Sequence, residues 1–444
     1  MMEIFNMTWN RRYSMMSYLK SSLWVVPVFA LIIELAVKRL FENFGVWMVR
    51  QGCYDLKTGF FALSAAEAHA VLDRIFTINL SCLVFTFGSL LVAIQVAGGQ
   101  YTPRIIATTL LRDNVIRCIV GFFVFTMLWA NRTMIQLGHL DVVPQFQLFL
   151  TMVFGLGAII AFILLIDYAA KLLRPVSLVG RIGEQGIEVI KNVYPDPARN
   201  VAVPALPSRK LGSPDHIINY QGKSGIVLAV NLQGLMSEAQ RTDSIIRVLP
   251  QVGDFLTEDD PLFYVYGNSG AIDGRKLLTL IALGSERTME QDPLFSFRIE
   301  VDIALKALSP AINDPTTAVL AIDQLHRLLR MVGMRSLRTH EIMDKTGQPR
   351  VIFRTPNWED FVHLTFREIR QSGAGNIQIA RRLREVVESL TQSLPEYRHP
   401  ALREELDLLD RAMAGHHLFP EDLALASIPD SQGLGATSHK QSQE

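Results

Sequence analysis

Apolar residues are distributed very unevenly along this chain, and this distribution limits its fold most. Four long apolar stretches lie within the first 175 residues, whereas most of the charged residues follow them. A helix of about 20 mostly apolar residues crosses a hydrocarbon core about 30 Å thick. The four stretches are residues 22–41, 75–97, 115–131 and 146–168. The sequence therefore predicts an α-helical membrane domain over residues 22–175 with about four transmembrane helices, after a short N-terminal segment over residues 1–21.

Basic residues near the ends of these stretches predict the orientation of the domain. Lys and Arg are retained preferentially on the cytoplasmic side of a membrane. Such residues lie before the first stretch, between the second and third, and after the fourth: Arg11, Arg12, Lys20, Arg104, Arg112, Lys171, Arg174 and Arg181. We therefore expect a multi-pass protein whose N- and C-termini are cytoplasmic. Residues 42–74 would lie outside, and the sequence leaves open whether they contact the membrane.

Three charged positions in the membrane half have local explanations. Ser64 and Glu67 fit a capping box, so a helix is expected to begin there and to run into the second stretch. Arg117 interrupts the third stretch and is expected to snorkel to its cytoplasmic end. Glu34 is a carboxylate inside the first stretch, and Lys38 lies four residues later, at the spacing of a helical ion pair. We interpret that pair as structural.

The second stretch is the most polar of the four, and two residue patterns recur along it. Ser81, Gly88 and Gln95 are spaced by seven residues, as are Asn79, Thr86 and Ala93, and we take them as two adjacent stripes of one helix. Small and polar residues of this kind allow close packing of membrane helices. The alternative is a water-filled path, for which the candidate pore-lining residues are Asn79, Thr86 and Gln95.

A short polar segment follows the second stretch. Gln100, Tyr101 and Arg104 lie within it, and an interfacial Tyr and Arg pair commonly anchors a helix at the headgroup level. The alternative is that these three residues form an inner pore mouth or contact lipid headgroups.

Three blocks of sequence carry a family resemblance. They are residues 87–97 (FGSLLVAIQVA), residues 100–104 (QYTPR) and residues 302–318 (DIALKALSPAINDPTTA). The chain resembles the bacterial membrane-protein family catalogued as domain of unknown function 2254, over about residues 20–415. This resemblance implies a location in the bacterial inner membrane. It implies no substrate, cofactor or catalytic residue.

The sequence of the second half of the chain predicts a cytoplasmic α/β domain. A proline-rich connector over residues 176–215 leads to a small β-rich subdomain over residues 216–285 and a helical subdomain over residues 286–415. The tail, residues 416–444, is rich in Ser, Gly and Gln towards its end and is expected to be largely disordered.

Polar residues around the turn between the first two helices of the helical subdomain form a candidate cytoplasmic polar site. Arg298 and Asp302 are spaced for an ion pair along one helix. Asp314 can cap the next helix, with Pro315 at its first position. A capped helix start explains these residues, and a ligand site is the alternative; its candidates are Arg298, Asp302, Asn313, Asp314, Thr316 and Thr317.

No catalytic motif is recognisable, so we do not expect an enzyme. The chain has no glycine-rich phosphate loop, His-Glu zinc motif or nucleophile elbow, and we expect no cofactor or metal. Basic and acidic residues number 43 each, which gives no reason to expect a nucleic-acid partner.

Two function classes remain after this exclusion. We favour a homo-oligomeric ion channel or channel-like transport protein with a cytoplasmic assembly or gating domain, because four spans are few for a monomeric transporter. The alternative is a membrane-anchored sensor or scaffold whose cytoplasmic domain binds a small ligand or protein. The expected partners are the lipid bilayer, further copies of the chain, and ions or a small ligand.

Overall fold

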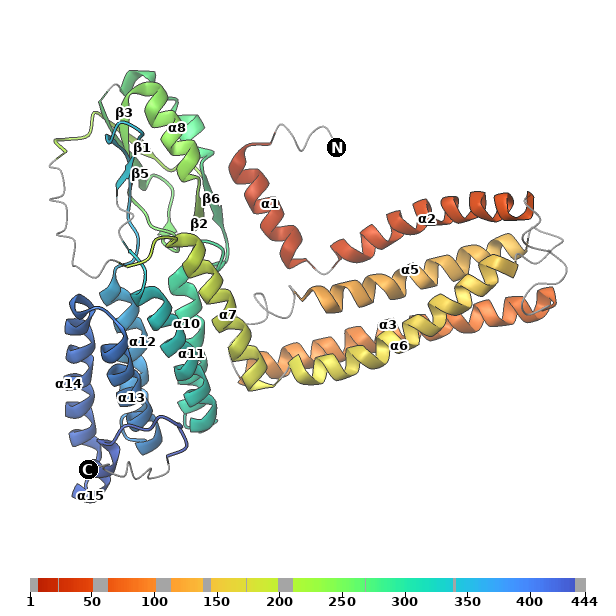
Figure 1. The fold of residues 1–444 in the computed structure, drawn as a ribbon. Coiled ribbons are helices and arrows are strands. Elements are labelled where there is room, and N and C mark those ends of the chain that lie inside the picture. The colour runs from red at the N-terminus through yellow and green to blue at the C-terminus, as the bar shows by residue number, and fades with distance from the viewer. Residues whose placement is uncertain are drawn as a thin grey trace. The chain divides into compact units, whose positions relative to one another are not determined.

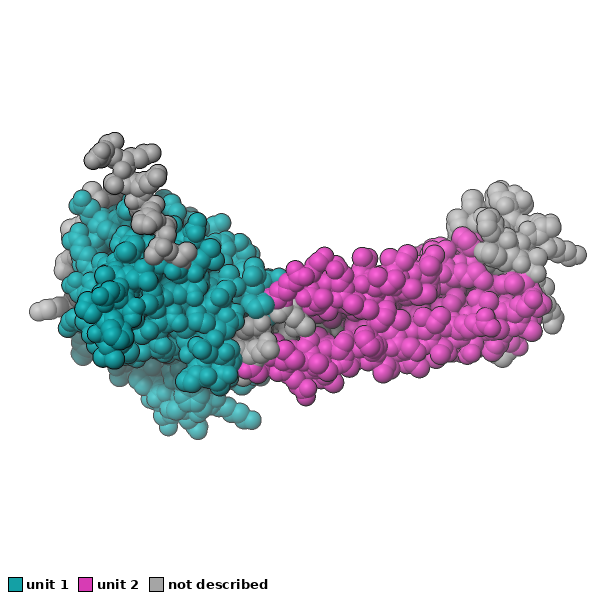
Figure 2. All heavy atoms as spheres, turned by 90° about the horizontal axis from the view of Figure 1, so that it is seen from below, with its two compact units in different colours: residues 1–18, 100–104, 175–444 teal, residues 19–99, 105–174 magenta. Residues whose placement is uncertain are grey.

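The chain forms two compact units in a computed structural model, which describes residues 7–22, 24–50, 63–100, 113–138, 145–172, 174–198, 211–267, 269–337 and 341–435. The membrane unit comprises residues 19–99 and 105–174 (Figure 2). The α/β unit comprises residues 1–18, 100–104 and 175–444. Each unit is described by itself below.

Long helices build the membrane unit (Figure 1). They are α2 (Val25–Arg50), α3 (Ala65–Gln100), α5 (Asn114–Leu137) and α6 (Gln145–Leu172). Helix α5 packs against both α2 and α6. A shorter helix, α1 (Trp9–Ser21), precedes α2.

Three of these helices are long and apolar enough to cross a membrane. They cover residues Ala65–Gly99, Asn114–Leu137 and Phe146–Leu172, which contain the second, third and fourth predicted spans. The first predicted span lies within α2, which does not meet this criterion because it carries several charged side chains, Glu34 and Lys38 among them. Three spans, not four, are therefore supported.

The predicted start of α3 is confirmed. The backbone N–H of Ser64 donates to Glu67 Oε2 at 2.9 Å, and the Glu67 N–H donates to Ser64 Oγ at 3.4 Å. The capping box therefore begins a single helix of 36 residues, which runs through the second span without a break.

Two sheets form the β-rich part of the α/β unit. One has the order β1-β5-β3-β8-β7 and the other has the order β4-β2-β6. All pairs are antiparallel except β3 with β8, where Ile246 lies opposite Val351. The strands are β1 (His216–Asn219), β2 (Gly225–Val230), β3 (Ser244–Val248), β4 (Phe255–Leu256), β5 (Pro261–Gly267), β6 (Ile281–Gly284), β7 (Glu341–Met343) and β8 (Pro349–Phe353).

The strands over residues 225–267 agree with the predicted β-rich subdomain. Strands β7 and β8 do not, because they lie in the region predicted to be helical and yet extend the same sheet. The predicted boundary at residue 285 is therefore wrong for this sheet. Buried apolar residues of β2, β3, β5 and β8 share one core with α8 (Leu232–Thr242) and α9 (Gly274–Leu278).

Packed helices form the rest of the unit. They are α7 (Pro175–Val193), α10 (Pro293–Leu308), α11 (Pro315–Gly333), α12 (Trp358–Gly373), α13 (Ile377–Ser393), α14 (His399–His416) and α15 (Pro420–Ala426), with short 3-10 turns η3 (Ser269–Ala271) and η4 (Glu396–Arg398). Five of them, α10 to α14, lie where the sequence predicts helices.

Helix α7 corrects the prediction of a connector over residues 176–215. It packs against α10 and α11 and buries Leu178, Ile182 and Ile190. The prolines on which the prediction rested, Pro195, Pro197, Pro204 and Pro207, lie beyond the end of this helix at Val193. The glycines of α7 allow close contact: a Cβ at Gly186 would lie 2.9 Å from Ser296 Cβ.

The tail also differs from the prediction of disorder over residues 416–444. Residues 420–426 form α15, and the described chain continues to residue 435. Arg381 and Arg382 of α13 donate to main-chain carbonyls of this segment, including those of Ile428 and Ser431. Two side chains from another helix therefore order a segment whose composition predicts disorder.

Candidate functional site

Charged side chains are buried between α2 and α5. Glu34 is 3% exposed and Lys38 is 2% exposed. Arg132 Nη1 donates to Glu34 Oε2 at 3.3 Å. Lys38 Nζ lies 3.4 Å from Thr133 Oγ1, to which it donates, and 5.5 Å from the centre of the Trp129 ring. Glu34 thus pairs with a residue of another helix, and not with the i+4 lysine that the sequence suggested.

Helix packing explains why these charges meet. A Cβ at Gly121 of α5 would lie 2.8 Å from Val26 Cγ1, so α2 approaches α5 closely there. Farther along the two helices, Lys38 lies beside Thr133. Lys38 and Thr133 are 95 positions apart in the chain, as are Val26 and Gly121. The two helices therefore run parallel, which brings the charges of α2 opposite the last turns of α5.

All four helices of the membrane unit contribute a buried polar atom that lacks a hydrogen-bond partner among the described residues. These atoms are Glu34 Oε1, Asn79 Oδ1, Thr126 Oγ1, Trp129 Nε1 and Gln147 Oε1. Polar groups at membrane depth normally find internal partners, and a buried group without one is a place where water or an ion can bind.

The candidate pore-lining residues do not share one face of α3. Asn79 and Thr86 are buried, at 1% and 4% exposure, whereas Gln95 is exposed. The stripe that contains Asn79 and Thr86 starts two residues before the stripe that contains Gln95. Two residues correspond to a rotation of about 200° around a helix of 3.6 residues per turn. The prediction of two adjacent stripes is therefore wrong, because they lie on opposite sides of α3.

Asn79 and Thr86 also bond within their own helix. Asn79 Nδ2 donates to the Ile75 carbonyl at 2.8 Å, and Thr86 Oγ1 donates to the Cys82 carbonyl at 2.7 Å. The Asn79 amide oxygen is then the group left for another partner. Gln100 is the last residue of α3, and its side chain, Tyr101 and Arg104 lie outside the described residues.

A second polar cluster lies at the start of α5. Asp113 accepts from the backbone N–H of Val115 at 2.9 Å and from the Tyr168 hydroxyl at 2.5 Å. Arg117 is buried and donates to the Leu19 carbonyl at 2.9 Å. Arg117 is therefore buried against a backbone carbonyl of the same unit, and does not extend into solvent as snorkelling would require.

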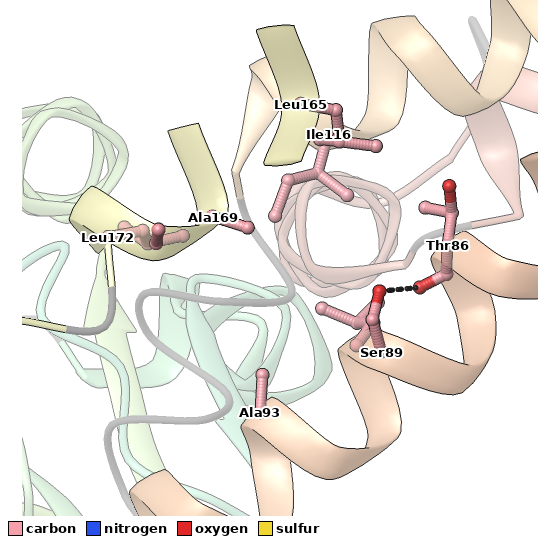
Figure 3. A pocket seen from close by; sticks show the side chains of 9 residues that line it. Thr86, Ser89, Ala93, Ile116, Leu165, Ala169 and Leu172 are labelled. Atoms are coloured by element: carbon pink, nitrogen blue, oxygen red, sulfur yellow. Dashed lines mark hydrogen bonds between the residues drawn. The ribbon is translucent and has the colours of Figure 1, made fainter. Parts of the chain in front are cut away.

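A cavity of about 120 Å³ lies between α3, α5 and α6 (Figure 3). Its lining residues are Thr86, Ser89, Leu90, Ala93, Ile116, Leu165, Ala169, Ala170 and Leu172. The Ser89 hydroxyl donates to the Thr86 carbonyl at 3.0 Å, so both hydroxyls in the wall already donate within α3. The rest of the lining side chains are apolar.

The candidate polar site of the α/β unit is divided between two structural roles. Arg298 Nε donates to Asp302 Oδ1 at 2.6 Å, and Arg298 also pairs with Glu368 of α12. Asp314 caps α11 by accepting from the Thr317 N–H at 3.1 Å, as predicted.

The two remaining candidates, Asn313 and Thr316, are not part of a buried polar site. Thr316 is exposed, and Asn313 is exposed with a positive φ of 47°. Packing and capping therefore account for Arg298, Asp302, Asp314 and Thr317.

Sequence reasoning missed most of the site between α2 and α5. It singled out Glu34, Lys38 and Asn79, but not Trp129, Thr133 or Gln147. The available signal was the pair of opposite charges inside an apolar run. No periodic pattern marked the residues that face it from α5 and α6.

Comparisons of the chain with known protein families and known proteins agree with a membrane protein. A family model described as "Predicted membrane protein (DUF2254)" matches residues 20–389. Uncharacterized proteins of Mycobacterium bovis and of two strains of Mycobacterium tuberculosis are each 23% identical to the chain over 417 residues, which is 91% of this chain and 78% of the relative. No solved structure matches the chain.

Proposed function

This chain belongs to the DUF2254 family of predicted membrane proteins, and from that premise we propose that it is a channel-like transport protein that conducts protons through its membrane unit. The observation that carries the proposal is the buried Glu34 carboxylate, whose Oε1 lacks a hydrogen-bond partner among the described residues. Ionisable side chains inside membrane segments commonly mark ion pathways and proton relays.

The unpaired atoms support a hydrated path. Four of the five can accept a hydrogen bond, namely those of Glu34, Asn79, Thr126 and Gln147. Water can donate to each of them, and such waters would connect polar groups from all four helices.

The charges favour a proton over a metal cation. Lys38 and Arg132 offset the negative charge of Glu34, so the cluster offers a bare cation little net attraction. Carboxylates inside membrane segments are, in contrast, common members of proton relays.

The proposal includes a topology and an assembly. In it, α2 also crosses the bacterial inner membrane, and both termini are cytoplasmic, as the basic flanking residues favour. Ser81, Gly88 and Gln95 lie on the exposed side of α3, and a Cβ at Gly88 would have open space around it. This small and polar surface suits contact with a second copy of α3. The α/β unit would then assemble or gate the oligomer.

Proton flux into liposomes tests the function. We expect purified protein to collapse an imposed pH gradient, as reported by a trapped pH-sensitive dye. Glu34→Gln should slow the flux at least about tenfold, because it removes the ionisable group from the path. Asp167→Asn is the matched control, since Asp167 is an exposed carboxylate of the same unit that pairs with Lys171.

Two results would reject the proposal. Equal flux in wild type and Glu34→Gln would exclude Glu34 from the path. A well-folded wild-type protein that conducts no ion under varied voltage and pH would favour a membrane-anchored sensor or scaffold.

A further inference from the structure

The cavity of the membrane unit has no role in the proposed proton path. Small residues line it: Ser89 and Ala93 lie on α3, and Ala169 lies on α6 (Figure 3). Ala170 of α6 also lines the cavity. Farther along the same two helices, larger side chains meet, and the rings of Phe85 and Phe162 are 5.6 Å apart. Helices α3 and α6 are therefore in contact beside the cavity, and a space remains between them where the small residues lie.

The wall of this cavity suits an apolar ligand. The hydroxyls of Thr86 and Ser89 donate to carbonyls of α3, so neither has a proton to offer a ligand. A buried water needs two to four polar partners, and apolar cavities of roughly 150 Å³ stay dry and bind molecules such as benzene. The volume of about 120 Å³ is close to that size and fits part of a hydrocarbon chain.

A cationic residue follows the last residue of the apolar wall closely in the chain. Leu172 lines the cavity, and the backbone N–H of Arg174 donates to the Lys171 carbonyl at 3.3 Å, which keeps Arg174 within one turn of Leu172. Lys171 already pairs with Asp167 at 2.6 Å. Arg174 is exposed and forms no ion pair with any residue in the described part of the chain.

We propose that the cavity binds one acyl chain of an anionic glycerophospholipid, whose phosphate lies beside Arg174. The apolar wall takes the chain, and the guanidinium complements the negative headgroup. In a bilayer, such lipids surround a membrane helix bundle, so the occupant is present at high concentration.

Native mass spectrometry of the full chain tests this proposal. Protein purified in detergent with equal phosphatidylglycerol and phosphatidylcholine should keep one phospholipid, with phosphatidylglycerol favoured about two- to fivefold, the range that follows from one exposed ion pair. Ala93→Phe should abolish retention by filling the cavity. Val92→Phe is the matched control, because Val92 is the preceding residue and is exposed. Arg174→Gln should keep the lipid but lose the headgroup preference.

A measurement on the unmodified protein covers the case in which Ala93→Phe fails to fold. Phosphatidylglycerol with a photoreactive group in its acyl chain should crosslink to peptides that contain residues 86–93 or 165–172. Crosslinks confined to other peptides would overturn the proposal. So would equal retention by Ala93→Phe and Val92→Phe, or a retained free fatty acid in place of a phospholipid.

Discussion

Glu300 is a fully buried ionisable group of the α/β unit. It lies on α10 and has 0% exposure. Neither carboxylate oxygen has a hydrogen-bond partner among the described residues. Burial therefore raises the pKa of Glu300 well above its ordinary value. A carboxyl group in such a place is held protonated, because ionisation without a partner costs several kcal/mol.

Glu300→Gln should make the stability of the α/β unit less dependent on pH. The raised pKa means that the folded state binds the proton more tightly than the unfolded state does. Its contribution to stability is complete below the ordinary carboxyl pKa and is lost as pH rises towards the folded pKa. Glu300→Gln should therefore increase the free energy of unfolding at pH 8 by about 1–3 kcal/mol, with little effect at pH 4.

Thermal melts of both proteins at the two pH values measure this effect. Glu404→Gln is the control, since Glu404 is exposed on α14. Other buried acids, such as Asp292, titrate alike in wild type and Glu300→Gln. The difference between the pH profiles of these two proteins therefore reports on Glu300. Parallel pH profiles for wild type and Glu300→Gln would contradict the prediction.

Helix α3 has two unlike faces. One buries Asn79 and Thr86 within the membrane unit, and the other exposes Ser81, Gly88 and Gln95. The Ser81 hydroxyl donates to the Thr77 carbonyl at 2.8 Å within α3. The Gln95 amide on the same face needs a partner at membrane depth, which another copy of the chain can supply. The outward face of α3 is thus where the proposed oligomer would form.

Gly88→Leu should separate folding from assembly. A side chain at Gly88 meets nothing within 4 Å in one copy, so the melting temperature should stay close to that of wild type. The same side chain would block close contact between two α3 helices, and the particle mass in detergent should fall to that of a monomer. Light scattering coupled to size-exclusion chromatography measures the mass. Gly180→Leu on α7, where the space is also open, is the control and should keep the wild-type mass.

At the scale of the whole molecule, the C-terminal segment closes the α/β unit. Arg381 is fully buried; its Nε donates to the Ile428 carbonyl at 2.9 Å and its Nη1 to the Gly435 carbonyl at 3.0 Å. Arg382 donates to the carbonyls of Asp430 and Ser431. A buried guanidinium without acceptors is costly, so this segment completes the helical core.

Removal of residues 427–444 should therefore destabilise the α/β unit. We expect its melting temperature to fall by at least about 5 °C, because several hydrogen bonds to buried charged groups are lost together. Removal of residues 436–444 alone is the matched truncation and should have little effect, since it leaves every one of these carbonyls in place. Equal melting temperatures for the two truncations, measured by differential scanning fluorimetry, would show that the segment contributes nothing.

Interactions within about four residues could be predicted from the sequence alone. The capping box at Ser64, the cap at Asp314 and the apolar length of α5 and α6 all follow from neighbouring residues. Each of these features needs only the local geometry of one helix, which is the same in any fold.

Tertiary structure decided which distant residues meet, because such contacts depend on how segments far apart in the chain align. Glu34 meets Arg132, 98 residues away, only through the register of α2 against α5. Strand β8 joins β3 across more than 90 residues, and the packing of α7 depends on the close fit of Gly183 and Gly186 against α11 and α10. The burial of Asn79 and the exposure of Gln95 depend equally on which side of α3 faces α6. The sequence by itself therefore determined the helices and their caps, whereas packing decided which polar groups lie together and which lack partners.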